Sequence, residues 1–400
     1  MSWVRQPPVY SPVDPLALAK SGLALLGDRS NRKDRVAELI AQAFNAREVL
    51  LADSGTSALV AALRALVPPG GTVAYPGYGC IDLTAAAIRA GVKVRLYDLD
   101  PATLSPDLDS VKRTVGRGVD AIVVTHLYGY AADLPAVNEI AATKGIPVIE
   151  DAAQAAGGLL NGSRLGALGD VSILSFGRGK GLTAGSGGAL LLRGANSFRL
   201  ATKIRSKLQA GRRGGSELIK LGAQWTLARP ALYRLPASIP ALRLGEMVYR
   251  PAAEPRAISD TAASMLASAL AMESGETKRR RVLAGSLLSS IGNAPRVSVI
   301  RSIEGGDPGY LRLPLIDRVG DLQPDDALGA IRGYPMTLDQ HPQLASILHA
   351  GEVSGSGSAL LRDRLFTLPT HSRVRASDAN RLSEWLGERR LAVPAEAWAT

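Results

Sequence analysis

The chain has one cysteine, Cys80, among its 400 residues. A single cysteine excludes an internal disulfide framework and any metal site built from several thiolates. Histidine is scarce too, and His341, His349 and His371 follow no metal-ligand spacing. We therefore expect no catalytic metal.

Long apolar runs are also missing. No run approaches the ~18–20 residues that a membrane span needs. The first eight residues lack the apolar core of a signal peptide. These absences lead us to expect a cytoplasmic enzyme without a transmembrane segment.

Positive charge is in excess, with a formal net charge of +11. Nucleic-acid binding would be one interpretation. Aromatic residues are only 4%, however, and no zinc-finger, ribonucleoprotein or helix-turn-helix signature accompanies the charge, so we expect no nucleic-acid partner. An ordinary solvated surface and the attraction of anionic substrates stay open. The basic clusters are Lys203, Arg205, Lys207, Arg212 and Arg213, and residues 278–281.

Helical and strand patterns alternate from about residue 34 to residue 192. The strands are wholly apolar, which indicates a mainly parallel sheet covered by helices on both faces, a three-layer αβα domain. Ligands bind such sheets at the carboxyl ends of the strands, where Ser54, Asp151 and Ser175 lie. The expected strands are 49–52, 72–75, 93–97, 121–125, 146–150, 171–175 and 188–192, and the expected helices are 36–43, 55–66, 81–91, 107–115 and 133–144.

Beyond about residue 250 the pattern changes to a helix over 258–292 and short strands near 310–313 and 365–368. We predict a large domain over residues 1–250 and a smaller C-terminal α+β domain over 251–400. The apolar, proline-broken stretch 219–250 is expected to form an irregular cover or a dimer contact. Peripheral contact with a membrane surface is the alternative, because interfacial helices also use aromatic and arginine side chains.

Lys180 lies between Gly179 and Gly181, five residues after Ser175 ends a strand. A desolvated lysine loses its proton and becomes a nucleophile that can form an imine with an aldehyde cofactor. The Ser175 hydroxyl could hold the phosphate of such a cofactor. An ordinary loop lysine is the alternative.

Two further segments supply matching chemistry. Ser54-Gly55-Thr56-Ser57 lies where a strand turns into a helix, a position that favours an anion, although a plain helix cap is the alternative. Asp151 ends the strongest apolar strand, where a carboxylate needs a partner. A protonated pyridine nitrogen would be that partner, and Gln154 could reach a ring oxygen. Together these residues supply what pyridoxal 5'-phosphate requires of its protein.

The chain resembles the DegT/StrS family of sugar aminotransferases, within fold type I of the pyridoxal-phosphate enzymes. The resemblance is close over residues 30–195 and weaker to His371. It rests on Ser54 through Leu59, Pro76-Gly77-Tyr78, Asp98 through Asp107, His126 through Gly129, Glu150 through Gln154, Gly166 through Asp170 and Ser175 through Gly188.

The resemblance implies that Lys180 binds the cofactor covalently and moves the substrate proton, while Asp151 pairs with the pyridinium. Gln154 would lie near the ring oxygen. Tyr78 and Cys80 fall where the cofactor ring is contacted. The phosphate would be held by Gly55, Thr56, Ser57 and Ser175. Family members with a histidine in place of this lysine are dehydratases, so Lys180 favours transamination.

Three positions depart from the family pattern. Cys80 stands where an aromatic residue often stacks on the cofactor ring, so Tyr78 or another group must cover that face. Ser186 replaces the usual glutamate. The asparagine-tyrosine-arginine segment by which a partner subunit reaches the phosphate is not recognisable after residue 200.

Three residues remain as weaker candidates. His126 is either a core histidine whose hydrogen bonds are satisfied within the protein, or an active-site residue. Arg178 could meet phosphate or a substrate carboxylate, and Arg312 the carboxylate of an amino donor.

The sequence thus predicts a homodimeric aminotransferase that moves nitrogen from an amino acid, with glutamate the first choice, to a keto-sugar that is linked to a nucleotide. Such a reaction would serve polysaccharide or secondary-metabolite biosynthesis. A regulatory protein on the same fold, dehydration and amino-ring formation are the alternatives.

Overall fold

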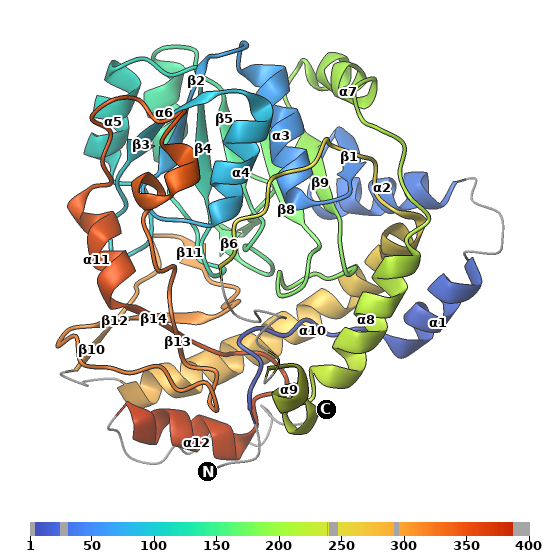
Figure 1. Ribbon diagram of the computed structural model, residues 1–400, viewed down its shortest axis with the longest axis vertical. Coiled ribbons are helices and arrows are strands. Elements are labelled where there is room, and N and C mark those ends of the chain that lie inside the picture. Colours follow the sequence, from blue (N-terminus) through green and yellow to red (C-terminus); the bar gives the residue numbers. More distant parts are fainter. Residues whose placement is uncertain (1–4, 25–30, 238, 240–246, 292–295, 387–400) are drawn as a thin grey trace.

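A seven-stranded sheet forms the centre of the larger part of the molecule (Figure 1). The structure is a computed structural model that describes residues 5–24, 31–237, 239, 247–291 and 296–386. The strand order is β1-β9-β8-β5-β4-β2-β3, and only β9 runs against its neighbours. This confirms the expected mainly parallel sheet. The strands are β1 (Glu48–Ala52), β2 (Thr72–Pro76), β3 (Lys93–Tyr97), β4 (Ala121–Thr125), β5 (Val148–Asp151), β8 (Val171–Ser175) and β9 (Gly188–Leu192).

Both faces of this sheet are covered by helices. In β4, Ala121 and Val123 pack on one face while Ile122 and Val124 pack on the other, and all four are fully buried. A strand buried on both faces reads as an unbroken apolar run. The first face carries α3 (Gly55–Leu66), α4 (Ile81–Ala90) and α7 (Ser197–Arg205). The second carries α2 (Arg32–Ala43), α5 (Leu108–Gly116), α6 (Leu134–Ala142) and the first half of α10 (Asp260–Ile291).

A four-stranded antiparallel sheet forms the smaller part, below the large sheet in Figure 1. Its order is β10-β12-β14-β13, and α10 and α12 (Ala376–Trp385) cover it. Helix α10 serves both parts, because Ala262 through Ala269 join the large core and Leu283, Leu287 and Ile291 join the small one. The strands are β10 (Val297–Val299), β12 (Leu313–Asp317), β13 (Ile331–Arg332) and β14 (Leu365–Leu368), with α11 (Ser356–Arg364) between the last two.

Short strands link the two parts. The order is β11-β6-β7, from β6 (Leu159–Leu160), β7 (Ser163–Arg164) and β11 (Gly306–Asp307). The N-terminal segment also crosses to the small sheet, where the Gln6 N–H donates to the Ala327 carbonyl at 3.1 Å. The domain division at residue 250 stays a prediction.

Two local expectations were wrong. The strand expected over 310–313 begins at Leu313, because Tyr310 has a left-handed backbone with φ of 46°, which an extended strand excludes. The stretch 219–250 is not irregular in its first half, which consists of α8 (Gly215–Leu227) and α9 (Pro230–Ala237). Proline at the first position of α9 is compatible with a helix. Residues 238 and 240–246 lie outside the described residues.

Helix α1 (Pro15–Ala24) packs beside α10 and α8. Among the described residues, no helix is long and apolar enough to cross a membrane.

Candidate active site

The predicted site residues follow the carboxyl ends of parallel strands of the large sheet. Ser54 follows β1, Tyr78 and Cys80 follow β2, and Asp151 and Ser175 end β5 and β8. The sheet order places β8, β5 and β4 side by side. The fold therefore brings together residues that are more than 120 positions apart in the chain, at the edge where such sheets bind ligands.

The N-terminus of α3 presents backbone donors that the helix itself does not use. Ser54 caps this helix, because its Oγ accepts the Ser57 N–H at 3.0 Å. The Ser57 hydroxyl is engaged with Ser54 at 2.9 Å, so Ser57 belongs to the cap. Gly55 adjoins the parallel bridge between Ser54 and Gly187, whereas the Thr56 N–H, in the first turn, has no acceptor within the helix. A donor in this position attracts an anion.

Ser175 lies close to this end of the helix. A Cβ atom added to Gly55 would lie 2.8 Å from the Ser175 Cβ and 3.1 Å from its Oγ. Only glycine allows this approach. Gly55, the Thr56 N–H group and the Ser175 hydroxyl thus form a cradle of a kind that fits a phosphate.

Asp151 is a buried carboxylate, with 8% of its surface exposed. Its Oδ1 accepts the Ala153 N–H at 3.0 Å, and its Oδ2 has a long contact with the Thr125 hydroxyl at 3.4 Å. Burial raises the pKa of Asp151, against the opposing effects of the Ala153 N–H, Lys180 and His126. A cation at Asp151, such as a protonated ring nitrogen, would stabilise its charged form.

Lys180 is half-buried and lines a pocket together with Ser175. It is close enough to Asp151 to lower the pKa of that carboxyl by its charge. The loop is fixed next to the lysine, since the Gly181 N–H donates to the Ser11 Oγ at 3.1 Å. The pocket thus combines an amine with the serine of the cradle, and the buried Asp151 directly precedes its lining residue Ala152. Its remaining lining residues are Phe44, Ala152, Ala156, Leu165, Leu174 and Leu182.

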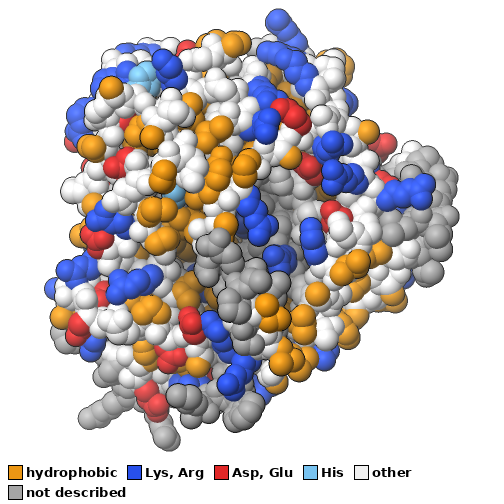
Figure 2. Space-filling view, in the orientation of Figure 1, with side chains coloured by type: hydrophobic (Ala, Val, Ile, Leu, Met, Phe, Trp, Pro, Cys, Tyr) orange, Lys and Arg blue, Asp and Glu red, His pale blue; other side chains and the backbone are white. Residues whose placement is uncertain are grey.

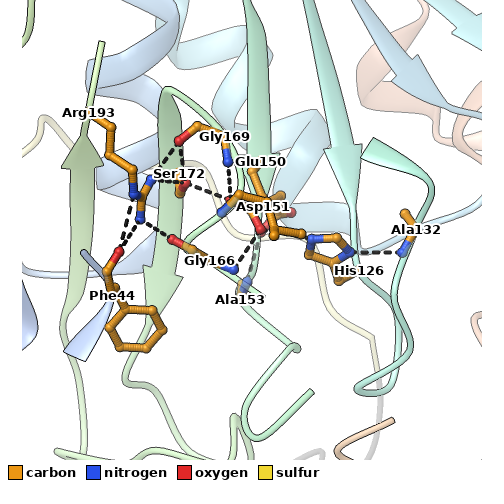
Figure 3. A network of polar contacts seen from close by, with 11 residues as sticks. Phe44, His126, Ala132, Glu150, Asp151, Ala153, Gly166, Gly169, Ser172 and Arg193 are labelled. Carbon is orange, nitrogen blue, oxygen red and sulfur yellow. Dashed lines mark hydrogen bonds and ion pairs between the residues drawn. The ribbon is translucent and has the colours of Figure 1, made fainter. Parts of the chain in front are cut away.

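A network of polar contacts fixes β5 next to Asp151 (Figure 3). Glu150 is fully buried and accepts hydrogen bonds from the N–H groups of Gly166, Leu168 and Gly169. It also accepts the Ser172 hydroxyl at 2.7 Å and contacts the His126 Nε2 at 3.0 Å. Burial alone would raise the pKa of Glu150, but His126 and the other donors lower it to about 2.

His126 is therefore a core residue. It is fully buried, and its Nδ1 accepts the Ala132 N–H at 2.9 Å while its Nε2 faces Glu150. Of the two interpretations, the structure favours the satisfied core histidine. The same network includes Arg193, which donates to the carbonyls of Gly169 and Phe44.

The ring-contact residues have different surroundings. Tyr78 is fully buried, and its hydroxyl accepts the Tyr334 N–H at 2.6 Å. Cys80 is half-buried, and burial raises the pKa of its thiol to about 12. Gln154 donates through Nε2 to the Tyr334 hydroxyl at 2.5 Å.

Sequence reasoning missed Tyr334. It belongs to the small part of the chain, 180 residues from Gln154, and no local pattern marks its contacts. The two arginine candidates do not join the pocket. Arg178 is exposed, and Arg312 is buried with its guanidinium on the Thr367 hydroxyl and the Gly329 and Thr367 carbonyls.

Comparison with known proteins identifies the family. Residues 17–228, more than half of the chain, match the DegT/DnrJ/EryC1/StrS aminotransferase family. The chain belongs to this family. Its members are pyridoxal-phosphate-dependent aminotransferases, in agreement with the resemblance found in the sequence.

Individual relatives agree with this assignment. The chain is 33% identical over 199 residues to L-glutamine:2-deoxy-scyllo-inosose aminotransferase of Streptomyces lividus, covering 48% of the chain and 47% of the relative. An enzyme of the same name from Micromonospora echinospora is 28% identical over 326 residues, covering 80% and 69%. The sugar aminotransferase CalS13 from Micromonospora echinospora has the same fold, with a TM-score of 0.75, 22% identity and coverage of 95% and 98%. The alignment to the first relative thus spans about half of that protein.

Proposed function

We propose that this protein is a pyridoxal-phosphate-dependent aminotransferase that moves nitrogen from an amino acid to a keto-sugar or a related polyhydroxylated ring ketone. The observation that carries this proposal is the placement of Lys180 within electrostatic reach of the buried Asp151, beside the cradle of Gly55, Thr56 and Ser175. Family membership supports the same reaction.

In this proposal each residue has one task. The cofactor supplies an electron sink that stabilises negative charge on the substrate carbon. Gly55, Thr56 and Ser175 hold its phosphate, and Asp151 holds its ring nitrogen in the protonated form. Lys180 would bind the cofactor. As a free amine it would carry the proton between the substrate carbon and the cofactor carbon. The Glu150 network keeps β5 rigid, so that Asp151 stays in place.

The amino donor is an amino acid. The relatives are named for L-glutamine as donor and for an inosose as acceptor, so glutamine joins glutamate as a choice for this chain. One buried arginine near Lys180 supports an anionic substrate. Arg280 has 1% of its surface exposed, its Nη1 lies next to Gly181, and its Nη2 has no hydrogen-bond partner among the described residues.

A nucleotide on the acceptor would suit the positive charge of the protein. Lys and Arg side chains occur over much of the visible face, interspersed with acidic ones (Figure 2). A free cyclitol, as in the relatives' names, is the competing acceptor. We further propose a homodimer, since Leu16 of α1 and Ile219 of α8 are 61% and 76% exposed, and a cytoplasmic location.

A two-stage experiment tests the function. The purified protein is loaded with pyridoxal phosphate and mixed with L-glutamine, L-glutamate or other amino acids, and the visible absorbance of the cofactor is followed. We expect one donor to bleach the band, and a keto-sugar or keto-cyclitol to restore it. If no donor bleaches a protein that has taken up its cofactor, the regulatory alternative is supported and the proposal fails.

A further inference from the structure

The family resemblance implies an aromatic side chain on the cofactor ring at position 80, and this chain has Cys80 there. A thiol offers no aromatic face. Tyr78 cannot replace it, since its ring is fully buried and its hydroxyl is bound to the Tyr334 N–H. Another aromatic side chain near Cys80 is needed.

Tyr334 is such a side chain. Its ring centroid lies 5.4 Å from that of Tyr78 and 6.1 Å from that of Tyr128, with which it is stacked at 25°. It is close enough to Cys80 for the two groups to interact electrostatically. Tyr78 and Tyr128 are 0% and 6% exposed, whereas Tyr334 is only half-buried. Of the three tyrosines, Tyr334 is therefore the one with the most surface left for a ligand.

The hydroxyl of Tyr334 lies at the predicted ring-oxygen side of the site. It accepts one N–H of the Gln154 amide at 2.5 Å. A primary amide has two such donors, so Gln154 keeps one for the cofactor. Gln154 thereby fixes the tyrosine next to the position that the ring would take.

The chain is built to hold Tyr334 there. A Cβ atom added to Gly333 would lie 2.1 Å from the Tyr78 hydroxyl oxygen. Any other residue at position 333 would push the Tyr334 backbone away from Tyr78. The contact between the small sheet and the loop after β2 thus depends on this glycine.

We propose that the ring of Tyr334 covers the cofactor ring, because position 80 carries a cysteine and offers no aromatic side chain. This inference rests on the proposed function. It assigns to the small part of the chain a cofactor contact that the family resemblance would place in the loop after β2.

Cofactor affinity tests the proposal without turnover. Apo protein is titrated with pyridoxal phosphate, and the dissociation constant is obtained from protein fluorescence and visible absorbance. We expect Tyr334→Ala and Tyr334→Leu to raise it roughly 2- to 10-fold, the range of an aromatic pair. Tyr334→Phe keeps the ring and should stay within about twofold of the wild type. Tyr310→Ala, in which the lost ring packs on Tyr130, is the control and should also stay there.

The decisive variant is the double substitution Cys80→Phe with Tyr334→Ala. It returns an aromatic side chain to the loop after β2, and we expect it to recover the wild-type dissociation constant within about twofold. Thermal unfolding of each apo variant checks the fold. Should Cys80→Phe not fold, the difference between Tyr334→Phe and Tyr334→Leu decides.

Two results would overturn the proposal. One is an unchanged dissociation constant in Tyr334→Ala and Tyr334→Leu. The other is a folded double variant that binds no better than Tyr334→Ala. Both differ from failure of the proposed function, which would show in the wild-type protein itself, either as no uptake of cofactor or as no bleaching by any amino donor.

Discussion

At the scale of single residues, one close contact sets the width of the proposed phosphate cradle. Gly55 lies at the first turn of α3 and Ser175 at the end of β8, and the space between them does not admit a methyl group. The serine hydroxyl therefore lies close to the N-terminus of α3. Geometry of this kind favours a compact anion.

Gly55→Ala should disturb both the cradle and the fold. Overpacking of this kind costs about 1–3 kcal/mol of unfolding free energy, and displacement of Ser175 should weaken binding of pyridoxal phosphate. Urea unfolding and a cofactor titration measure the two effects. Gly222→Ala in α8 is the matched control, because nothing lies within 4 Å of the added atom. Equal stability and equal cofactor affinity in the two variants would contradict the cradle.

At the scale of one element, β5 carries two adjacent carboxylates whose pKa values are shifted in opposite directions. Successive side chains of a strand point to opposite faces. Glu150 faces a full set of donors, which lower its pKa to about 2, whereas burial raises the pKa of Asp151. The strand thus has one carboxylate that is satisfied within the chain and one that is still available to a cationic partner.

Glu150→Gln should destabilise the protein strongly. The glutamine amide keeps one acceptor oxygen, but its NH2 group would face the N–H and O–H groups that now donate to the carboxylate. The loop 166–172 therefore loses its anchor. Leaving buried N–H donors without their acceptor costs about 1–3 kcal/mol each, which urea unfolding at neutral pH would detect. Glu139→Gln on the exposed side of α6 should change the unfolding free energy by less than about 0.5 kcal/mol. A midpoint for Glu150→Gln like that of the wild type would refute this role of the network.

The elements of the large sheet were predictable because their signals are local. The apolar run at 121–125 indicates a strand, and the turn at Ser54 indicates the start of a helix. Both β4 and α3 have the expected bounds. Lys180 and Asp151 were likewise identified from their segments, and their roles remain predictions. Tyr334 and Ser11 were not predictable, because their contacts with Gln154 and Gly181 join distant parts of the chain.

At the scale of the whole molecule, the N-terminal segment and the small sheet are joined around His371. This histidine is 1% exposed, and its Nε2 contacts the Pro7 carbonyl at 2.8 Å while its Nδ1 accepts the Arg373 N–H at 3.3 Å. That arrangement requires the neutral ring. Burial, with the nearby Arg312, Arg280 and Arg373, lowers the pKa of His371 from 6.5 to about 3.

His371 should make the molecule sensitive to acid. Below pH 6.5 the unfolded chain binds a proton at His371, whereas the folded chain does not bind it until the pH falls to about 3. Stability is therefore complete above pH 6.5 and falls as the pH drops, by up to about 1.4 kcal/mol per unit. Urea unfolding between pH 7 and 4 should give a shallower slope for His371→Asn than for the wild type. Parallel slopes would show that this histidine does not remain neutral in the fold.

The most direct test of the central claim is reduction of the cofactor-loaded protein with borohydride, followed by digestion and mass spectrometry of the peptides. The account predicts that the mass of the reduced cofactor is found on the peptide that contains Lys180, and that Lys180→Arg abolishes it. Attachment at another lysine, or no attachment in folded protein with excess cofactor, would contradict the account.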